Sequence, residues 1–316
     1  MCTVVTLAKN GFYFGRNMDI DRDFGQKVVV TPREYALATK RAGVILRHYA
    51  MIGAARVEDG YPLYAEACNE TGLCMAALNF PGNAVYAESD ESGKTALAPY
   101  ELIPYILAKC ADIGEAKREL EKTEIISLPF NDRLPLAPLH WIVADKEGCV
   151  TVERTVKGIK VFDNPYGVLT NNPPFDFHRE NVKNYLGLSA ENPATRECGE
   201  TKISPFSQGA GAVGLPGDFS SSSRFVKAFF CKSNSVCGEK RGACEAQAFH
   251  ILSTVAMPKG SVITADGKCD FTAYSCVIDA GPAIYAFRTY DSADVKRVHM
   301  TEEYAKGDVL SVFDMV

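Results

Sequence analysis

The chain has 316 residues, of which 47% are hydrophobic, and it carries a formal net charge of −5 at pH 7. A chain of this length and composition can bury a large core. Its acidic balance and the absence of a basic cluster argue against a nucleic-acid partner. No Gly/Ser-rich linker, charge block or low-complexity tract divides the sequence, so we expect residues 2–316 to form a single domain.

The first residues contain a short apolar run but none of the features of a targeting segment: no positive start, no long apolar stretch and no small-residue cleavage site. No window approaches the roughly 18 uncharged apolar residues of a membrane span. We therefore expect a soluble, cytoplasmic protein that does not enter a membrane. The sequence also lacks a Gly-x-Gly-x-x-Gly motif and a phosphate-binding P-loop, so a nucleotide cofactor is not indicated.

Eleven cysteines are the unusual feature of the composition. No two are spaced as CxxC, and no histidine follows at the spacing of a zinc finger, so a metal site is not expected. The five histidines are scattered without an HxxxH pair. In a reducing compartment most of these thiols would be small, buried residues. The cysteines stand at positions 2, 68, 74, 110, 149, 198, 231, 237, 244, 269 and 276.

The sequence opens with a pattern of strand, turn and strand. Thr3–Leu7 is rich in β-forming residues, Asn10-Gly11 is a strong hairpin turn signal, and Phe12–Gly15 continues as a strand. Further short strands are expected at Val28–Thr31, within Val44–Gly53 and at Gly72–Leu78.

Helices are expected in the middle of the chain. Apolar residues recur at helical spacing in Pro99–Ala111, and a second helix is expected over Ile113–Lys122. The later expected elements are strands at Leu139–Ala144, Cys149–Arg154 and Val168–Leu169, helices at Phe177–Tyr185, Ser220–Phe230 and Ala243–Val255, and strands at Val262, Phe271–Ile278 and Ala283–Thr289. Strands at both ends with helices grouped between them predict an α+β or layered sandwich fold rather than alternating βαβ units.

The position of Cys2 gives it a special chemistry. Methionine aminopeptidase removes Met1 when the next residue is small, and the new N-terminus then carries a thiol and an α-amine on one residue. A free thiol has a pKa of about 8.5 and an α-amine one of about 7.7–8.0, so a modest shift lets the amine accept the thiol proton. One residue then supplies both nucleophile and base, as in N-terminal-nucleophile enzymes. Most cysteines near a terminus are inert, however, so Cys2 alone does not establish catalysis.

Two charged residues follow the expected hairpin. The turn at Asn10-Gly11 brings Arg16 back beside Cys2, where its guanidinium would favour the thiolate. The carboxylate of Asp19 could hold the α-amine by charge and by hydrogen bond. Taken alone, a surface Arg–Asp pair at a strand end is the commoner arrangement.

Six stretches of the sequence resemble the choloylglycine hydrolase family, which holds bile salt hydrolases and penicillin V acylases. They are Met1–Thr3, Gly15–Asp19, Asn79–Gly82, Leu169–Pro173, Gly214–Asp218 and Ser223–Phe225. No single motif is specific for the family. The order and spacing of all six, from residue 2 to about residue 290, are specific for it. The resemblance implies an α+β fold, the four-layer αββα sandwich of two antiparallel sheets found in N-terminal-nucleophile hydrolases. It also implies a homotetramer.

The resemblance implies roles for particular residues. Cys2 is the nucleophile and its α-amine the general base, Asp19 orients that amine, and Arg16 supports the thiolate and borders the substrate. Asn79 and Asn171 form the oxyanion hole, Asn79 through its backbone N–H and Asn171 through its side chain.

Physical arguments accompany these roles. A tetrahedral intermediate needs donors aimed at its oxyanion, and the loss of one donor costs roughly 10²–10³ in rate. Asn171 follows a strand end and precedes a Pro-Pro turn, where a side chain can be held rigidly, although an Asx turn is the commoner role of such an asparagine. By resemblance Arg224 organises the same polar network, and otherwise it would be an ordinary helix-surface cation. No metal or organic cofactor is expected, because protein groups supply base, nucleophile and electrostatics.

Two features bear on the substrate. Position 79 is Asn, which resembles bile salt hydrolases of the Gram-positive type, whereas penicillin V acylases often carry Tyr there. Met18 and Ile20 are apolar side chains suited to the broad wall that a steroid needs. By position in the resemblance, the wall is completed by Ala65, Phe130 and Leu134. Ordinary core packing is the alternative for all of these apolar residues.

We therefore predict a bile salt hydrolase, an amidase that cleaves glycine- or taurine-conjugated bile acids through a Cys2 thioester. Amino-acid transfer onto a bile acid would follow when an amine replaces water. Penicillin V acylase is the nearest alternative. A non-catalytic ligand-binding protein would lack the nucleophile or an oxyanion donor, and a cysteine-rich redox or metal protein would need CxxC or clustered ligands. We expect the glycine-rich Gly209–Gly214 to be a flexible loop near the site that bears on the choice of conjugate.

Overall fold

The strand–turn–strand unit at the N-terminus forms the centre of the molecule. In the computed structural model, which describes residues 1–89, 93–240 and 242–315, β1 (Cys2–Ala8) and β2 (Phe12–Ile20) pair as an antiparallel hairpin. Asn10 and Gly11 both have positive φ, as a tight hairpin turn requires. Nearly all residues of both strands are buried, because other layers cover the two faces of the sheet.

The hairpin belongs to a seven-stranded antiparallel sheet with the order β14–β1–β2–β18–β19–β20, in which β17 also pairs with β18. β18 runs along β2 and so brings the C-terminal part of the chain beside the N-terminus. The added strands are β14 (Val168–Leu169), β17 (Val262–Ile263), β18 (Cys269–Asp279), β19 (Ile284–Thr289) and β20 (Lys296–His299).

A second sheet has eight strands in the order β13–β12–β11–β8–β7–β6–β3–β21, and all its pairings are antiparallel. β6 and β7 approach closely at Gly53, where a Cβ atom would lie 2.0 Å from the backbone oxygen of Glu66. The strands are β3 (Lys27–Thr31), β6 (Met51–Glu58), β7 (Tyr61–Asn69), β8 (Cys74–Asn79), β11 (Leu139–Ala144), β12 (Cys149–Thr155), β13 (Gly158–Asp163) and β21 (Ser311–Asp314).

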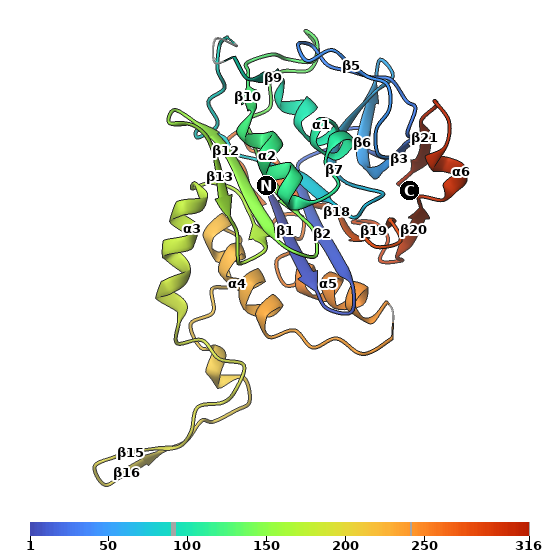
Figure 1. Cartoon of the computed structure of the whole chain (residues 1–316). Coiled ribbons are helices and arrows are strands. Elements are labelled where there is room, and N and C mark those ends of the chain that lie inside the picture. Colours follow the sequence, from blue (N-terminus) through green and yellow to red (C-terminus); the bar gives the residue numbers. More distant parts are fainter. Residues whose placement is uncertain (90–92, 241, 316) are drawn as a thin grey trace.

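Helices cover the outer faces of the two sheets (Figure 1). α1 (Leu102–Lys109) and α2 (Ile113–Glu121) pack on the second sheet, and α4 (Ser221–Ser233) and α5 (Ala243–Ser253) pack on the first. Ser220 caps α4 by accepting a hydrogen bond from the backbone of Ser223. The expected α+β fold, a four-layer αββα sandwich of two antiparallel sheets, is confirmed.

Smaller elements complete the chain. Two short pairs lie outside the large sheets, β4 (Leu37–Ala38) with β5 (Val44–Ile45), and β9 (Thr95–Leu97) with β10 (Thr123–Ile125). The other α-helices of the described residues are α3 (Phe175–Asn181) and α6 (Glu302–Ala305), and turns of 3-10 helix lie at Pro99–Glu101 and Val182–Tyr185. Within the described ranges, no helix combines the length and the apolar character needed to cross a membrane.

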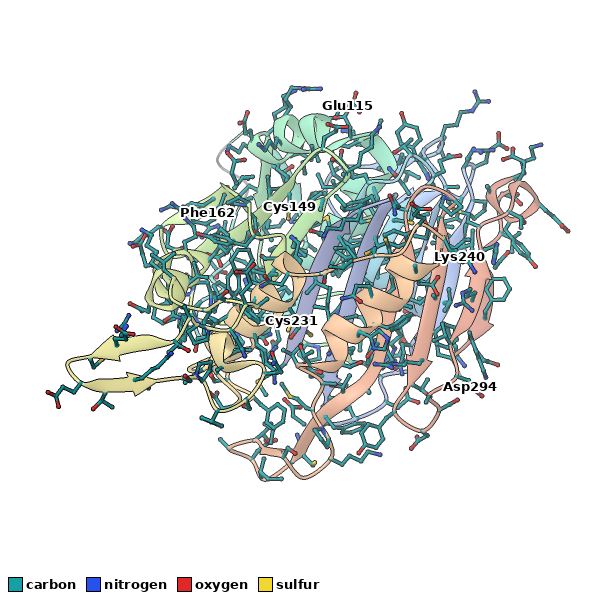
Figure 2. The ribbon with its side chains drawn as sticks, turned by 90° about the horizontal axis from the view of Figure 1, so that it is seen from below. Glu115, Cys149, Phe162, Cys231, Lys240 and Asp294 are labelled. Carbon is teal, nitrogen blue, oxygen red and sulfur yellow. The ribbon has the colours of Figure 1, made fainter. Side chains whose placement is uncertain are left out.

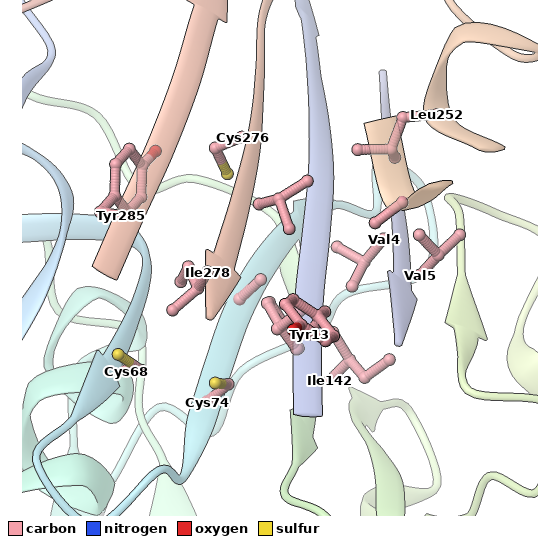
Figure 3. Close-up of a cluster of buried hydrophobic side chains, with 14 of the residues drawn as sticks. Val4, Val5, Tyr13, Cys68, Cys74, Ile142, Leu252, Cys276, Ile278 and Tyr285 are labelled. Atoms are coloured by element: carbon pink, nitrogen blue, oxygen red, sulfur yellow. The ribbon is translucent and has the colours of Figure 1, made fainter. Parts of the chain in front are cut away.

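A continuous apolar core joins the two sheets. Figure 3 shows Val4 and Ile278 from the first sheet beside Ile142 and Cys74 from the second, all of them fully buried. Leu252 of α5 belongs to the same cluster. Because one core holds both sheets, residues on β1, β2, β7 and β18 keep fixed positions relative to one another.

The segment between α3 and α4 projects from the body as an arm that ends in the hairpin of β15 (Arg196–Cys198) and β16 (Thr201–Ile203) (Figures 1 and 2). The glycine-rich stretch lies in this segment and contains a turn of 3-10 helix over Ala210–Ala212. None of the described residues that line the main cavity comes from this stretch. The expectation that this stretch borders the site was therefore wrong, and its flexibility stays a prediction.

Most expected strands and helices are confirmed, but β7 was not anticipated. Its sequence contains Pro62 and the charged Glu66, and both weaken a strand pattern. The strand expected within Val44–Gly53 is divided between β5 and β6, and β6 continues to Glu58. β13, β20 and β21 were also not anticipated, because they are short and partly exposed.

Candidate active site

Cys2 is the first residue of β1, and only 3% of its surface is exposed. In the hairpin register it stands opposite Met18, so residues of β2 surround it. Arg16 of β2 donates from Nη2 to the Cys2 sulfur at 3.1 Å. The turn at Asn10-Gly11 thus brings a guanidinium to the thiol, and an adjacent positive charge favours the thiolate form.

Arg16 is itself completely enclosed. Its Nη1 lies 2.6 Å from Glu66 Oε2 and donates to the backbone oxygen of Ala65 at 2.7 Å. Burial works against the charge on Arg16, but Cys2 and Glu66 outweigh it, so the pKa of the guanidinium lies well above its ordinary value. The side chain is therefore a fixed positive charge beside the sulfur.

Asp19 follows Met18, the residue of β2 that stands opposite Cys2, and it is 2% exposed. Its Oδ1 accepts a hydrogen bond from Thr272 Oγ1 at 2.6 Å. Its Oδ2 is buried, makes no hydrogen bond to any described residue and lies 3.9 Å from Arg224 Nη1. A buried carboxylate oxygen without a donor is costly, so this atom is available to a protonated amine.

Asn171 connects the nucleophile to the second sheet. Its Oδ1 accepts from the backbone N–H of Cys2 at 2.9 Å and from Arg224 Nη2 at 2.7 Å. Its Nδ2 donates to the backbone oxygen of Asn79 at 2.8 Å, which leaves the second hydrogen of that amide for another acceptor. Asn79 ends β8 and lines the cavity in front of Cys2.

Arg224, on the first turn of α4, reaches the N-terminal strand from the helix layer. Its Nη1 donates at 2.6 Å both to the Cys2 backbone oxygen and to Thr3 Oγ1, and its Nε donates to the backbone oxygen of Phe219 at 2.9 Å. Burial lowers the pKa of Arg224, partly offset by Asp19 and Cys2. The helix-surface alternative for Arg224 was wrong, since it is 1% exposed.

The strand end that carries Asn171 is fixed from behind. Its backbone N–H donates to Ser221 Oγ at 2.8 Å, and its backbone oxygen lies 3.0 Å from His178 Nε2. The His178 ring stacks on Phe225 with 4.8 Å between centroids. Burial lowers the pKa of His178 to about 4. The neutral ring thus holds the loop without adding a charge near Cys2.

A cavity of about 1200 Å³ opens in front of Cys2. Four of the residues with expected catalytic roles line it: Cys2, Arg16, Asp19 and Asn79. Asn171 and Arg224 are not among the lining residues and contact Cys2 by the hydrogen bonds above. All the expected wall residues also line the cavity, namely Met18, Ile20, Ala65, Phe130 and Leu134.

Aromatic rings build one side of this cavity. The rings of Tyr100 and Phe130 meet edge to face with 5.3 Å between centroids, and Tyr61 packs against both. Tyr100 and Phe130 line the cavity, as do Leu63 and Ile103. Such a wall suits a large, rigid apolar group.

Several residues of the site carry no sequence motif that would identify them. Glu66 and Thr272 hold Arg16 and Asp19, and Tyr100 adds to the aromatic wall. A charged residue inside an otherwise apolar strand is the one available signal, and it applies to Glu66. The described residues contain no group of three or more His, Cys, Asp or Glu side chains placed to hold a metal ion.

Met1 lines the cavity together with Cys2. Its amine donates to the backbone oxygen of Asp19 at 2.5 Å and lies 3.3 Å from Asp270 Oδ2. As long as Met1 is attached, the nitrogen of Cys2 is an amide and cannot act as a base. Removal of Met1 would convert this nitrogen, which donates to Asn171 Oδ1 at 2.9 Å, into a free α-amine.

A model of the family described as linear amide C–N hydrolases, choloylglycine hydrolase family, matches residues 2–311. The chain belongs to the choloylglycine hydrolase family. It is 40% identical over 304 residues to a bile salt hydrolase/transferase of Lactiplantibacillus plantarum, with 96% of this chain and 94% of that protein covered. It is 35% identical to a bile salt hydrolase/transferase of Clostridium perfringens, with 99% and 96% covered.

Solved structures of the family have the same fold. The C2A mutant of conjugated bile acid hydrolase from Clostridium perfringens superposes with a TM-score of 0.91 at 33% identity, covering 99% of this chain and 97% of that one. Penicillin V acylase from Agrobacterium tumefaciens gives a TM-score of 0.77 at 23% identity, covering 99% and 90%. The second likeness concerns the fold alone. As a family member, this chain is an amidase that acts on linear C–N bonds.

Proposed function

We propose that this choloylglycine hydrolase cleaves the amide bond of glycine- or taurine-conjugated bile acids. One observation carries the proposal: the sulfur of Cys2, 3.1 Å from Arg16 Nη2, faces a cavity of about 1200 Å³ with an aromatic and aliphatic wall. The relatives named bile salt hydrolase/transferase cover nearly the whole chain and support it. A steroid acyl group needs a wide apolar chamber next to a nucleophile, and this cavity supplies one.

The acylation step uses groups on both sheets. After removal of Met1, the α-amine of Cys2 takes the thiol proton, and the thiolate sulfur bonds to the amide carbonyl carbon while Arg16 stabilises its charge. The oxyanion receives the free hydrogen of Asn171 Nδ2 and the backbone N–H of Asn79. The C–N bond breaks as the α-ammonium, oriented by Asp19, gives its proton to the leaving nitrogen. Glycine or taurine departs and a Cys2 thioester remains.

Deacylation reverses these roles. The neutral α-amine takes a proton from water, and the hydroxide oxygen attacks the thioester carbonyl. The C–S bond then breaks, the free bile acid is released, and the thiolate recovers its proton from the ammonium. An amino acid that enters in place of water forms a new amide, so we include amino-acid transfer among the activities. Every proton and electron pair in the cycle belongs to protein, substrate or water, and we propose that no cofactor takes part.

The substrate assignment depends on the apolar wall. We propose that Met18, Ile20 and Ala65 contact the acyl group close to Cys2, and that Phe130 and Leu134 contact its rings. All of them line the cavity, which supports a substrate-binding role over pure core packing. Penicillin V, whose phenoxyacetyl group has a single ring, would fill far less of this space. Hydrolysis of penicillin V is accordingly expected to be the weaker activity.

The test combines intact mass with activity. We expect the purified protein to lack Met1 and to release glycine from glycocholate, and Cys2→Ser to lower kcat/KM on the order of 10⁴-fold or more. Cys198→Ser, the same change at an exposed thiol, is the matched control and should leave activity unaltered. Active protein that retains Met1 would refute the mechanism. Faster release of phenoxyacetate from penicillin V than of glycine from glycocholate would instead assign the chain to the acylases.

Three further statements belong to this proposal. We propose that residues 2–316 work as one domain, that the protein is cytoplasmic, and that four copies assemble. All eleven cysteines are free, as they would be in a reducing compartment. The projecting arm exposes Phe206 and Val213, which are 96% and 77% accessible and could be covered by another copy. Sedimentation of the intact chain at several concentrations would reveal a monomer if the tetramer is wrong.

A further inference from the structure

Glu66 lies directly behind Arg16 and is completely inaccessible to solvent. It is on β7 of the second sheet, and its Oε2 is 2.6 Å from Arg16 Nη1. Arg16 therefore has two partners on its two terminal nitrogens, the Glu66 carboxylate at Nη1 and the Cys2 sulfur at Nη2. Burial of a charged pair is costly unless its remaining hydrogen-bonding capacity is filled, so the other contacts of Glu66 matter.

Three other donors reach the Glu66 carboxylate from the first sheet. Tyr285 OH donates to Oε1 at 2.6 Å, Tyr274 OH lies 3.0 and 3.1 Å from the two oxygens, and Cys276 Sγ lies 3.5 Å from Oε1. Cys276 and Tyr285 come from neighbouring strands, β18 and β19 (Figure 3). Burial raises the pKa of all three groups well above their ordinary values. They therefore keep their hydrogens and act as donors at neutral pH.

The Glu66 carboxylate and the Cys2 thiolate compete for the charge of Arg16. A close ion pair with Glu66 offsets the positive charge of the Arg16 guanidinium. The electrostatic stabilisation that Arg16 gives to a thiolate at Cys2 is then smaller. Each hydrogen bond that Glu66 accepts spreads the carboxylate charge and weakens its pairing with Arg16. The donors on the first sheet thus control how much of the Arg16 charge stabilises the nucleophile.

We propose that Glu66 is a positioning residue that fixes Arg16, and that Tyr274, Tyr285 and Cys276 set the share of the Arg16 charge that reaches the Cys2 sulfur. The proposal rests on the function proposed above, because it concerns the same nucleophile. Glu66 is not one of the cavity-lining residues, and it acts on the Cys2 sulfur only through Arg16. The ionisable groups around Cys2 and Glu66 are Arg16 and Asp19 of β2, Cys68 of β7, Cys74 of β8, Asp270, Tyr274 and Cys276 of β18, Tyr285 of β19, Arg224 of α4 and the α-amine of Cys2.

Two substitutions are expected to act in opposite directions. Glu66→Gln keeps the shape and one acceptor for Arg16 but removes the competing charge, so Cys2 should ionise at lower pH, by roughly one unit. Tyr285→Phe removes a donor and concentrates charge on Glu66, so Cys2 should ionise at higher pH, by roughly a few tenths of a unit. If Glu66 and Tyr285 served only in packing, the two substitutions would not shift the ionisation of Cys2 in opposite directions.

Alkylation provides the readout without a substrate. Mature protein is treated with iodoacetamide across a pH series, and the modified fraction of the N-terminal peptide is measured by mass spectrometry, which separates Cys2 from the other thiols. The midpoint pH of the profile is compared between variants, not the plateau rate. A thiolate of lower pKa is a weaker nucleophile, so the plateau rate changes together with the pKa. The Cys2 thiol and its α-amine titrate as a coupled pair, so each midpoint belongs to both groups. Because this coupling is the same in every variant, the midpoints can be compared. The acid limb of kcat/KM for glycocholate should move in parallel.

Glu101→Gln is the matched control, because Glu101 is another buried glutamate and its oxygens accept from the backbone of Ala98 and Lys40 and from Tyr100 OH, not from Arg16. We expect it to leave the Cys2 midpoint unchanged. If Glu66→Gln and Tyr285→Phe move the midpoint in the same direction, or neither moves it, the proposal is overturned. If Glu66→Gln does not fold, Tyr274→Phe and Tyr285→Phe decide, since both must raise the midpoint. If the two variants move the Cys2 midpoint in opposite directions but the protein does not hydrolyse glycocholate, only the proposed function is rejected.

Discussion

The two sides of the cavity are built differently. On one side, Cys2, Arg16 and Asp19 stand on paired strands of the first sheet and are no more than 3% exposed. On the other side, Phe130 and Leu134 lie in the half-buried loop between β10 and β11. The first group is held by hydrogen bonds from three layers of the fold, whereas the wall is held by ring packing.

The difference follows from what each side must do. Bond making and breaking require donors and charges fixed to within a fraction of an ångström, and strands in a shared core provide that precision. A wall that only excludes water and encloses an apolar group tolerates small movements, so a loop suffices. We therefore expect substitutions on the strand side to change kcat steeply, and those on the loop side to change mainly KM.

The steepest test of this difference after the nucleophile is Asn171→Ala. It removes an oxyanion donor and the acceptor for the Cys2 backbone, so kcat for glycocholate should fall roughly 10²–10³-fold while KM changes little. Asn172→Ala is the control, because among the described residues that neighbouring side chain hydrogen-bonds only to the backbone oxygen of Pro81, at 3.3 Å. Steady-state kinetics of both variants give the answer. Equal kcat in Asn171→Ala and wild type would remove Asn171 from the oxyanion hole.

The support behind Asn171 should also make the strand side sensitive to acid. Burial lowers the pKa of His178 to about 4, whereas the unfolded chain takes up the proton near 6.5. The unfolded state therefore binds more protons between these values, and stability is complete above pH 6.5 and lost as the pH falls toward 4. The loss should reach about 3 kcal/mol.

Urea unfolding at a series of pH values measures this loss. His178→Gln keeps a donor for the Asn171 backbone but cannot take up the proton, so its unfolding free energy should vary less across the window. His250→Gln, at an exposed position, should keep the wild-type slope. An unchanged slope in His178→Gln would mean that other groups cause the acid sensitivity.

The same contrast explains what could be predicted from the sequence. Local sequence signals predict that Arg16 lies beside Cys2. The two-residue turn at Asn10-Gly11 determines which residues of β2 pair with which residues of β1. Glu66 escaped notice because its importance depends on β7 lying against β2 and β18 from another sheet, and no local pattern encodes that contact. Tyr100 was missed for the same reason, because α1, α2 and β10 separate it in the sequence from Phe130, which its ring contacts.

The glycine-rich stretch at Gly209–Gly214 gives the opposite lesson. Its composition predicts flexibility, yet backbone oxygens of Ser189 and Glu191 would lie 2.6 and 1.9 Å from a Cβ at Gly211, so glycine is needed there for close packing. Composition alone does not distinguish a glycine that permits motion from one that permits close approach. The wall residues were found only through resemblance, because apolar side chains at loop positions look like ordinary core residues in a sequence.

The smallest expected effect concerns the wall. Phe130→Ala removes a ring that packs against Tyr61 and Tyr100, and the loop can partly close over the space, so KM for glycocholate should rise roughly five- to tenfold with kcat nearly constant. Val156→Ala, in the exposed turn between β12 and β13, is the control and should leave KM unchanged. A fall in kcat as large as that of Asn171→Ala would mean that the loop positions the reacting carbonyl. The wall would then belong to the precise side of the cavity, and the contrast between strand and loop would not hold.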